Sequence, residues 1–264
     1  MSLVDDLKKD LRLKGHNIDE KNALKLARFL DELDNCKDCH GLDECKNLAI
    51  GRVPHLEGEE IVYSSCGFMK KELALSKVNS SSASNYHQDA NFDDFNTETE
   101  PRKKAKEYAL KFNYKKDKGL YISGKFSTGK TYFLSALANK LALDGVSTVI
   151  VFMPDFSRDF KSSMSENNLE DRVNELKKVD VLMLDDLGGE MMTSWLRDEI
   201  IAPIIQYRMI NNLPIFISSN MEYSQLESHF KQTKDDNDAL KSQRILERIK
   251  KMTKRVIFND EYKD

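Results

Sequence analysis

The stretch GKFSTGKTYF, residues 124–133, carries the clearest structural signal in this sequence. It fits the pattern G-x-x-x-x-G-K-[S/T], in which the backbone N–H groups of a glycine-containing loop surround a phosphate. The apolar run 120–122 before it predicts a strand, and the alanine- and leucine-rich segment 131–145 after it predicts a helix. This order places the phosphates at the N-terminus of the helix, where the helix dipole favours negative charge.

The residues of this loop are the predicted nucleotide site. We expect the side chain of Lys130 to reach the β- and γ-phosphates and the hydroxyl of Thr131 to bind Mg²⁺. A chance match in a glycine turn is disfavoured, because a strand and a helix flank the loop as the motif requires. The predicted nucleotide-binding residues are Gly124, Lys125, Phe126, Ser127, Thr128, Gly129, Lys130, Thr131 and Tyr132.

The composition is typical of a globular protein with a charged surface, because 40% of its 264 residues are hydrophobic and 32% are charged. This length predicts one or two domains. The formal net charge of -3 provides no overall attraction for nucleic acid, so any such contact has to be local. No run approaches the roughly 18 apolar residues of a membrane span, and the N-terminus lacks the apolar core of a signal peptide. We therefore expect a cytoplasmic protein without a membrane contact, in a reducing compartment where disulfides are rare.

The chain changes character near residue 75. Residues 77–100 are rich in Ser, Asn and Asp and nearly free of aliphatic side chains, which is typical of a linker. All the cysteines precede this stretch, and all the strand-like apolar runs follow it. We predict a first domain over 1–75, a flexible linker over 76–92 and a second domain over 93–264.

The second domain alternates strand-like and helix-like segments. This alternation predicts an α/β fold in which helices cover both faces of a parallel five-stranded sheet. The phosphate-binding loop after the first strand makes it the sheet of a nucleoside-triphosphatase. The predicted strands are the apolar runs 119–123, 147–154, 179–188, 213–220 and 255–259.

Polar residues end two of these strands. The buried run 181–184 leads into Asp185 and Asp186, and another strand leads into Asn220. Because a parallel strand delivers its last residues to the edge where the phosphates lie, we assign Asp185 to Mg²⁺ through its water shell. Asp186 is then the predicted base or positioning group for the attacking water, and the Asn220 amide could orient that water. The alternatives are surface acids at a strand end and an ordinary turn asparagine.

Two clusters of basic residues are candidates for contacts with phosphates. Arg244 and Arg248 lie four residues apart, on one face of a predicted helix, where one could complete the ATP site of a neighbouring subunit. Residues 101–118 hold eight Lys or Arg against two acids, with aromatic residues between them. Such a segment could follow the backbone of single-stranded DNA, although lysine-rich helices are more often merely solvated.

The four cysteines predict a zinc site in the first domain. Cys36 and Cys39 form a C-x₂-C pair, and Cys66 follows about 30 residues later, which is a spacing typical of tetrahedral zinc. We expect these three thiolates to bind Zn²⁺, with the fourth ligand open between Cys45 and His55. A bound ion would stabilise a domain of this small size.

Other interpretations of the cysteines are weaker. His40 is a less suitable ligand, because it adjoins Cys39 in the chain. A redox C-x-x-C motif lacks the βαβ context that it needs, and the thiols could also be inert and buried.

The stretch 182–220, LMLDDLGGEMMTSWLRDEIIAPIIQYRMINNLPIFISSN, resembles bacterial helicase loaders of the DnaI type. It is similar more distantly to DnaC loaders and to IstB-type transposition ATPases. The resemblance covers residues 90–260 well and extends to the cysteines. The W-x-R-D-E segment at Trp195 and the segment 244–251, RILERIKK, are specific to the family, whereas the phosphate-binding loop is not.

The resemblance implies an AAA+ ATPase that binds the hexameric replicative DNA helicase and helps to place it on single-stranded DNA. It implies ATP, Mg²⁺ and Zn²⁺ as cofactors, a homo-oligomer on the helicase, and a zinc-binding domain that contacts the helicase. The matching positions are Lys130 and Thr131 for nucleotide and Mg²⁺, Asp185 and Asp186 for the Walker B acids, Asn220 for sensor 1, and Arg248 for the arginine finger with Arg244 one turn before it. The family's sensor-2 arginine has no clear match, and Lys263 is the nearest substitute.

Rival functions remain at this point. An IstB-type transposition ATPase would act with a transposase on duplex DNA, and the cysteine-containing domain argues against it. A nucleotide-binding adaptor would turn ATP over negligibly, because Asp186 stands where a Glu is more usual. A small-molecule kinase would need a lid and an acceptor pocket, and neither is evident.

Overall fold

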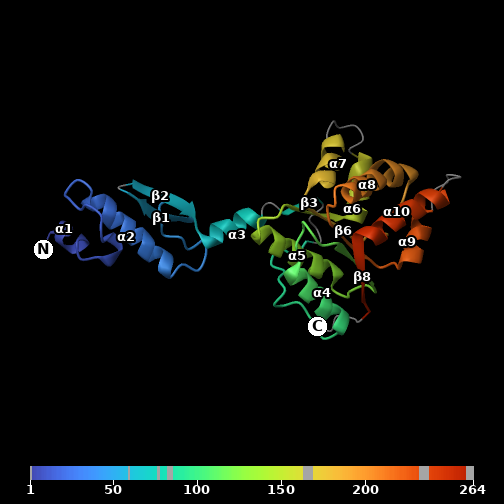
Figure 1. Ribbon diagram of the computed structural model, residues 1–264, viewed down its shortest axis with the longest axis horizontal. Coiled ribbons are helices and arrows are strands. Elements are labelled where there is room, and N and C mark those ends of the chain that lie inside the picture. Colours follow the sequence, from blue (N-terminus) through green and yellow to red (C-terminus); the bar gives the residue numbers. More distant parts are fainter. Residues whose placement is uncertain are drawn as a thin grey trace. The chain divides into compact units, whose positions relative to one another are not determined.

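The computed structural model describes residues 2–58, 60–75, 78–81, 86–162, 169–231 and 238–259 (Figure 1). The chain divides into two compact units, Met1–Leu73 and Ala74–Asp264. No helix within these described ranges is long and apolar enough to cross a membrane. Lys263, the predicted sensor-2 substitute, lies outside the described residues.

The first unit combines helices with a two-stranded antiparallel sheet in which β1 pairs with β2. The helix α2 packs on this hairpin through apolar residues at helical spacing, among them Leu26, Phe29 and Leu30, which are buried. Its Glu32 is also buried and accepts a hydrogen bond of 2.9 Å from the Tyr63 hydroxyl. The elements are α1 (Leu3–Leu7), η1 (Leu11–Leu13), α2 (Ala23–Lys37), β1 (Arg52–Glu57), β2 (Glu60–Ser65) and α3 (Gly67–Leu75), the last of which crosses into the second unit.

The second unit is built on a parallel sheet with the strand order β3-β5-β6-β7-β4-β8. The five predicted strands are all present, and the phosphate-binding loop follows β4, which lies between β7 and the edge strand β8. A sixth strand, β3, pairs with β5 at the edge, although its residues were expected in the linker. The polar sequence can add to the edge because backbone groups, and not side chains, make the pairing. The strands are β3 (Val78–Ser81), β4 (Gly119–Gly124), β5 (Thr148–Phe152), β6 (Val181–Asp185), β7 (Ile215–Ser219) and β8 (Thr253–Phe258).

Alternate residues of the strands face two separate cores. In β5, Val149 and Val151 belong to one apolar cluster and Ile150 belongs to the other. In β7, Ile217 and Phe216 divide in the same way. Both faces of the sheet are therefore covered, as continuous apolar runs in parallel strands predict.

Helices α4 and α5 belong to the core on one face, and α7 to α10 with η4 belong to the core on the other. Figure 1 shows α4 and α5 on one side of the sheet and α7, α8 and α10 on the opposite side. The helices are α4 (Glu100–Lys111), α5 (Lys130–Leu143), α6 (Met153–Ser162), α7 (Leu169–Lys178), the π-helical segment η4 (Leu196–Ile201), α8 (Ala202–Ile210), α9 (Tyr223–Phe230) and α10 (Asp238–Met252).

Part of the predicted linker 76–92 packs on the core of the second unit. Ala90 and Phe92 are buried in the cluster that contains α5. The side-chain amide of Asn139, on α5, donates hydrogen bonds to the backbone oxygens of Gln88 (2.9 Å) and Ala90 (2.7 Å). A few apolar side chains in this mostly polar segment are thus enough to attach it to the core.

A buried arginine joins α8 to the start of two strands. The Arg208 side chain has no exposed surface, and burial lowers its pKa to about 9. Its guanidinium donates hydrogen bonds to the backbone oxygens of Leu176, Lys177, Val179, Asp180 and Pro214.

We expect Arg208→Met to lower the free energy of unfolding by about 3 kcal/mol, because buried carbonyl groups lose their donors. Arg255→Met is the control, because Arg255 is exposed and contacts only side chains, Glu222 in a partly exposed ion pair and the ring of Tyr223 at 5.5 Å, among the interactions that the described residues show. This substitution should change stability by less than about 1 kcal/mol. Urea denaturation of both variants measures the difference. Equal urea midpoints for the two variants would show that the hydrogen bonds of Arg208 do not stabilise the fold.

Candidate functional site

The loop between β4 and α5 has the shape that a phosphate requires. Gly129, at the start of α5, has φ 76°, and Ser127 has φ 57°, so the chain turns through the left-handed region twice. A Cβ atom on Gly124 would lie 1.8 Å from the backbone oxygen of Phe258, so only glycine fits there. The buried Arg102 also supports the loop, because its guanidinium donates a 2.7 Å hydrogen bond to the backbone oxygen of Thr128.

Lys130 lies at the centre of this loop. Its ammonium donates to the backbone oxygens of Gly124 (3.0 Å) and Lys125 (2.5 Å). Burial lowers the pKa of Lys130 to about 8, although the charges of Asp186 and Asp185 act in the opposite direction. A nucleotide phosphate would supply the anionic partner that stabilises the charged form.

Asp185 and Thr131 lie together as a magnesium site requires. The Thr131 hydroxyl is 3.0 Å from one carboxylate oxygen of Asp185, and the Ser218 hydroxyl donates to the other at 2.5 Å. Burial raises the pKa of Asp185, which is only 1% exposed. A divalent cation would favour the ionised carboxylate, so the two oxygen ligands fit Mg²⁺ held largely through its water shell.

Asp186 and Asn220 are held next to each other. The Asn220 amide donates to the Asp186 carboxylate at 2.9 Å, and Asp186 adopts φ 55°, which turns it out of strand β6. Burial raises the pKa of Asp186. The Oδ1 atom of Asn220 is buried and has no hydrogen-bond partner among the described residues, so it can accept a hydrogen bond from a water. The structure therefore brings together the two side chains expected to orient the attacking water.

These residues surround a cavity of about 350 Å³. Its walls include three residues that the sequence did not single out, His87, Phe152 and Ser218. The ring of His87 lies 5.8 Å from that of Tyr132, and its backbone N–H donates to Ser135 on α5. His87 was missed because it lies in the stretch with linker composition. Of the predicted nucleotide residues, the cavity is lined by Phe126, Ser127, Thr128, Gly129, Lys130, Thr131 and Tyr132.

The predicted arginines lie elsewhere. Arg244 and Arg248 are on α10, where they line a separate cavity of about 470 Å³ together with Glu247 and Lys251. Neither arginine lines the nucleotide cavity that contains Lys130 of the same chain. This placement suits a side chain that acts on a neighbouring subunit.

All four cysteines line one cavity of about 420 Å³ in the first unit. Backbone N–H groups lie close to two of the sulfur atoms. The backbone nitrogen of Gly51 is 3.5 Å from Sγ of Cys45, and that of Met69 is 3.3 Å from Sγ of Cys66. His55 does not line this cavity, and its ring nitrogen lies 2.6 Å from the Ser64 hydroxyl. Within the described residues no His, Cys, Asp or Glu side chains are arranged as a closed metal site.

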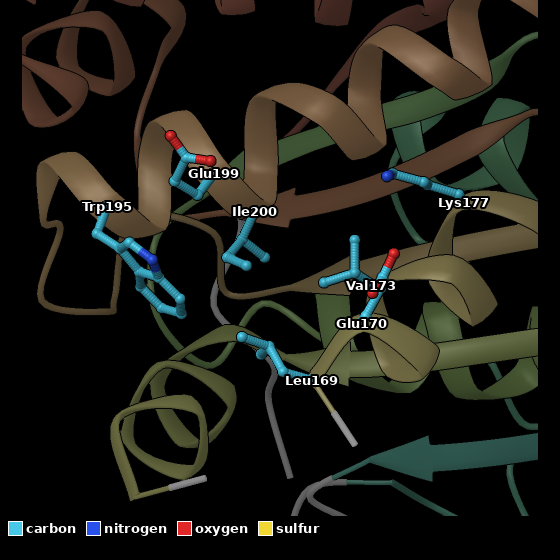
Figure 2. A pocket seen from close by; sticks show the side chains of 7 residues that line it. All are labelled: Leu169, Glu170, Val173, Lys177, Trp195, Glu199 and Ile200. Atoms are coloured by element: carbon cyan, nitrogen blue, oxygen red, sulfur yellow. The ribbon is translucent and has the colours of Figure 1, made fainter. Parts of the chain in front are cut away.

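A further cavity of about 460 Å³ lies between α7 and η4 (Figure 2). Its lining includes Trp195 from the family-specific segment, Ile200 beside it and Val173 across from it. Its charged residues are of both signs, and none of its lining residues also lines the nucleotide cavity. Trp195 is partly buried and packs against the core cluster that contains residues of α7 and η4.

The parallel sheet, the phosphate-binding loop and the acids at the end of β6 together define an ATP-binding protein of the AAA+ class. The chain belongs to the family described as IstB-like ATP binding protein, whose model matches residues 51–263.

Two relatives refine this assignment. The replicative helicase loader DnaI of Bacillus subtilis (strain 168) is 35% identical over 257 residues, which is 92% of this chain and 83% of that protein. The replicative helicase loader DnaC of Buchnera aphidicola subsp. Baizongia pistaciae (strain Bp) is 34% identical over 148 residues, 53% of this chain and 59% of the relative.

Solved structures agree with the fold. A crystal structure of DnaI is 39% identical, with a TM-score of 0.59, and covers 65% of this chain and 92% of that chain. A putative primosome component from Streptococcus pyogenes serotype M3 is 26% identical, with a TM-score of 0.60, and covers 73% of this chain and 98% of that one. The predicted resemblance to DnaI-type loaders is confirmed.

Proposed function

We propose that this chain is an ATP-dependent loader that binds the hexameric replicative DNA helicase and helps to place it on single-stranded DNA. One observation carries the proposal, which is the 35% identity to a replicative helicase loader over 92% of this chain. Because the match includes the first unit as well as the ATPase unit, it favours a whole loader over an isolated ATPase domain.

The residues of the nucleotide cavity have distinct roles in this proposal. Lys130 binds the β- and γ-phosphates, and Thr131 with Asp185 holds Mg²⁺, which when bound neutralises phosphate charge. Asp186 accepts a proton from the attacking water or positions it, and Asn220 orients the same water. The pair at 2.9 Å supports this division, because both side chains face one cavity with Lys130.

The position of the arginines supports the proposal of a homo-oligomer. Arg248, with Arg244 one turn away, lies on α10 and away from the nucleotide cavity of its own chain. We assign Arg248 as the arginine finger that a subunit supplies to the ATP of its neighbour. ATP would thereby stabilise the assembled loader, and its hydrolysis would weaken the interface and release the helicase.

The contact with single-stranded DNA is assigned to the segment 101–118. In the structure Lys103, Lys104 and Lys111 on α4 are exposed, and none of them makes an ion pair within the described residues. Lys254 of the adjoining strand β8 is exposed too and lies 4.3 Å from the ring of Tyr108. Unpaired lysines next to aromatic rings suit a phosphate backbone with stacked bases.

Zinc in the first unit is also a proposal. We assign Cys36, Cys39, Cys45 and Cys66 as the ligands, because these four line one cavity and His55 does not. Thiol side chains rotate about a single bond, so small rotamer changes would bring the sulfurs to one ion, and metal binding is itself coupled to folding. The backbone N–H groups beside two of the sulfurs would stabilise thiolates.

Co-precipitation with the cognate replicative hexamer tests the loader function. We expect the full chain with ATP to retain the helicase, and a version without residues 1–75 to lose it, because the proposed contact lies in the first unit. Retention by the truncated chain would move the contact to the ATPase unit. No retention by either protein would favour a transposition ATPase of the IstB type, which should instead retain a transposase on duplex DNA.

The adaptor hypothesis differs from the loader in turnover alone. Asp186 has one methylene fewer than the Glu that is more usual at this position, so a slow rate is expected in either case. ATP turnover that rises with single-stranded DNA would exclude an adaptor without hydrolysis.

A further inference from the structure

A buried glutamate, Glu190, lies in the same turn as Asp186, four residues further along the chain. The turn that follows β6 brings the Glu190 carboxylate back onto its own backbone, where it accepts a 2.8 Å hydrogen bond from the N–H of Gly188. Within the same turn the N–H of Gly189 donates to the backbone oxygen of Asp186 at 2.9 Å. Asp186 is thus the first residue of a tight turn, and Glu190 closes that turn from the protein interior.

The second oxygen of Glu190 contacts a histidine from a distant segment. Nε2 of His229, on α9, lies 2.9 Å from Oε1 of Glu190. Both side chains are buried, and that of Glu190 has no exposed surface. Each oxygen of this carboxylate therefore has a partner, one from the turn itself and one from α9.

The helix that supplies His229 is itself held firmly. Arg197, fully buried, donates at 3.1 Å to the backbone oxygen of Phe230 at the end of α9. The Arg197 side chain also pairs with Asp198, which accepts a 2.9 Å hydrogen bond from Lys241 on α10. His229 consequently projects from an element that is fixed to its neighbours and can serve as an anchor.

Packing alone does not explain this pair. A buried carboxylate loses its hydration, and a pair of apolar residues of similar volume could fill the same space at no loss of stability. The turn instead carries Asp186 at φ 55°, a backbone conformation that non-glycine residues rarely adopt without support. The pair connects this turn to α9, and such a connection can hold the turn in this conformation.

We propose that Glu190 and His229 are positioning residues for Asp186, which hold its carboxylate at the place where the attacking water is oriented. The inference rests on the proposed ATPase function. Neither residue lines the nucleotide cavity, so both act through Asp186 and not on the nucleotide. The burial and the nearby Glu190 charge that raise the pKa of Asp186 are consistent with this arrangement.

The test compares apolar and conservative variants in the full chain. Because His229→Leu alone would leave a buried charge unpaired, the decisive protein is the double variant Glu190→Leu/His229→Leu. We expect its kcat to fall about 10-fold, while KM and the affinity for a fluorescent ATP analogue change less than about 2-fold. Glu190→Gln, which keeps an acceptor for the Gly188 amide, should recover most of the rate. Glu227→Gln, at an exposed ion pair on the same helix, is the control.

A merely structural pair would give other results. A folded double variant with the wild-type kcat overturns the proposal, and so does an equal loss of kcat and nucleotide affinity in every variant, including Glu190→Gln. Failure of the ATPase function is recognised separately, as wild-type protein that does not turn over ATP. In that case amide hydrogen exchange of residues 186–190 tests whether the pair holds the turn. The double variant should exchange faster there, and unchanged protection would overturn the proposal.

Discussion

Replacing Lys130 with alanine is expected to reduce ATP turnover by a factor of about 10²–10³, the usual loss when one preorganised charge-stabilising donor is removed. The ammonium is buried within the loop, where it has a lowered pKa of about 8 and contacts backbone oxygens at 2.5 and 3.0 Å. Steady-state phosphate release measures the effect, and a fluorescent ATP analogue reports how much of it is lost affinity.

Lys125→Ala is the matched control for this prediction. Lys125 belongs to the same loop, carries the same charge and was among the predicted nucleotide-binding residues, but its side chain is exposed and does not line the nucleotide cavity. We expect its removal to change turnover less than about threefold, because a solvated charge is screened. If Lys130→Ala deposited helicase on DNA as well as the wild type, ATP would not be the switch of the loader, whatever its effect on hydrolysis.

The nucleotide site was predictable because its residues either follow one another in the chain or stand at the ends of parallel strands. Eight consecutive residues specify the loop, and the rule that parallel strands end at one edge brings Asp185 and Asn220 to it. The pairing of Glu190 with His229 was not predictable, since 39 residues separate them and neither belongs to a motif. A buried contact of this kind becomes visible only when the turn after β6 has packed against α9.

Composition misled the prediction at the linker. Residues 77–100 have few aliphatic side chains, yet Phe92 and Phe95 are buried there and contact Phe133 of α5 edge to face. A few aromatic residues bury as much surface as a longer aliphatic run. Average composition therefore underestimates how firmly such a segment attaches, and the same averaging hid His87 beside the nucleotide cavity.

The cysteines show a different limit. Their spacing predicted Cys36, Cys39 and Cys66 as ligands, but the choice between Cys45 and His55 depends on the path of the loop before β1. In the structure Cys45 lines the cavity with the other thiols, whereas His55 lies within β1 and contacts Ser64. The sequence contains both side chains at acceptable spacing, and the positions of the two side chains in the fold favour Cys45 in the proposed zinc site.

Cys45→Ser is accordingly expected to lower the affinity for zinc by at least a factor of about 100, whereas His55→Ala should leave one zinc per chain at the wild-type affinity. A hydroxyl is a far poorer ligand than a thiolate for this ion, and loss of one of four ligands opens the tetrahedral site. Metal content by atomic emission after dialysis, with a competing chelator to rank affinities, distinguishes the two variants.

The same variants connect the ion to the proposed loader function. Because metal binding and folding are coupled in small domains of this kind, Cys45→Ser should also lose the helicase in co-precipitation and lower the thermal stability of the first unit. Its ATP turnover should be unchanged, since the nucleotide cavity lies wholly in the second unit. Zinc lost on His55→Ala and retained on Cys45→Ser would reverse the assignment. Helicase binding that survives the loss of zinc would separate the metal from the contact, and the surface that the loader uses would then have to be sought on the ATPase unit.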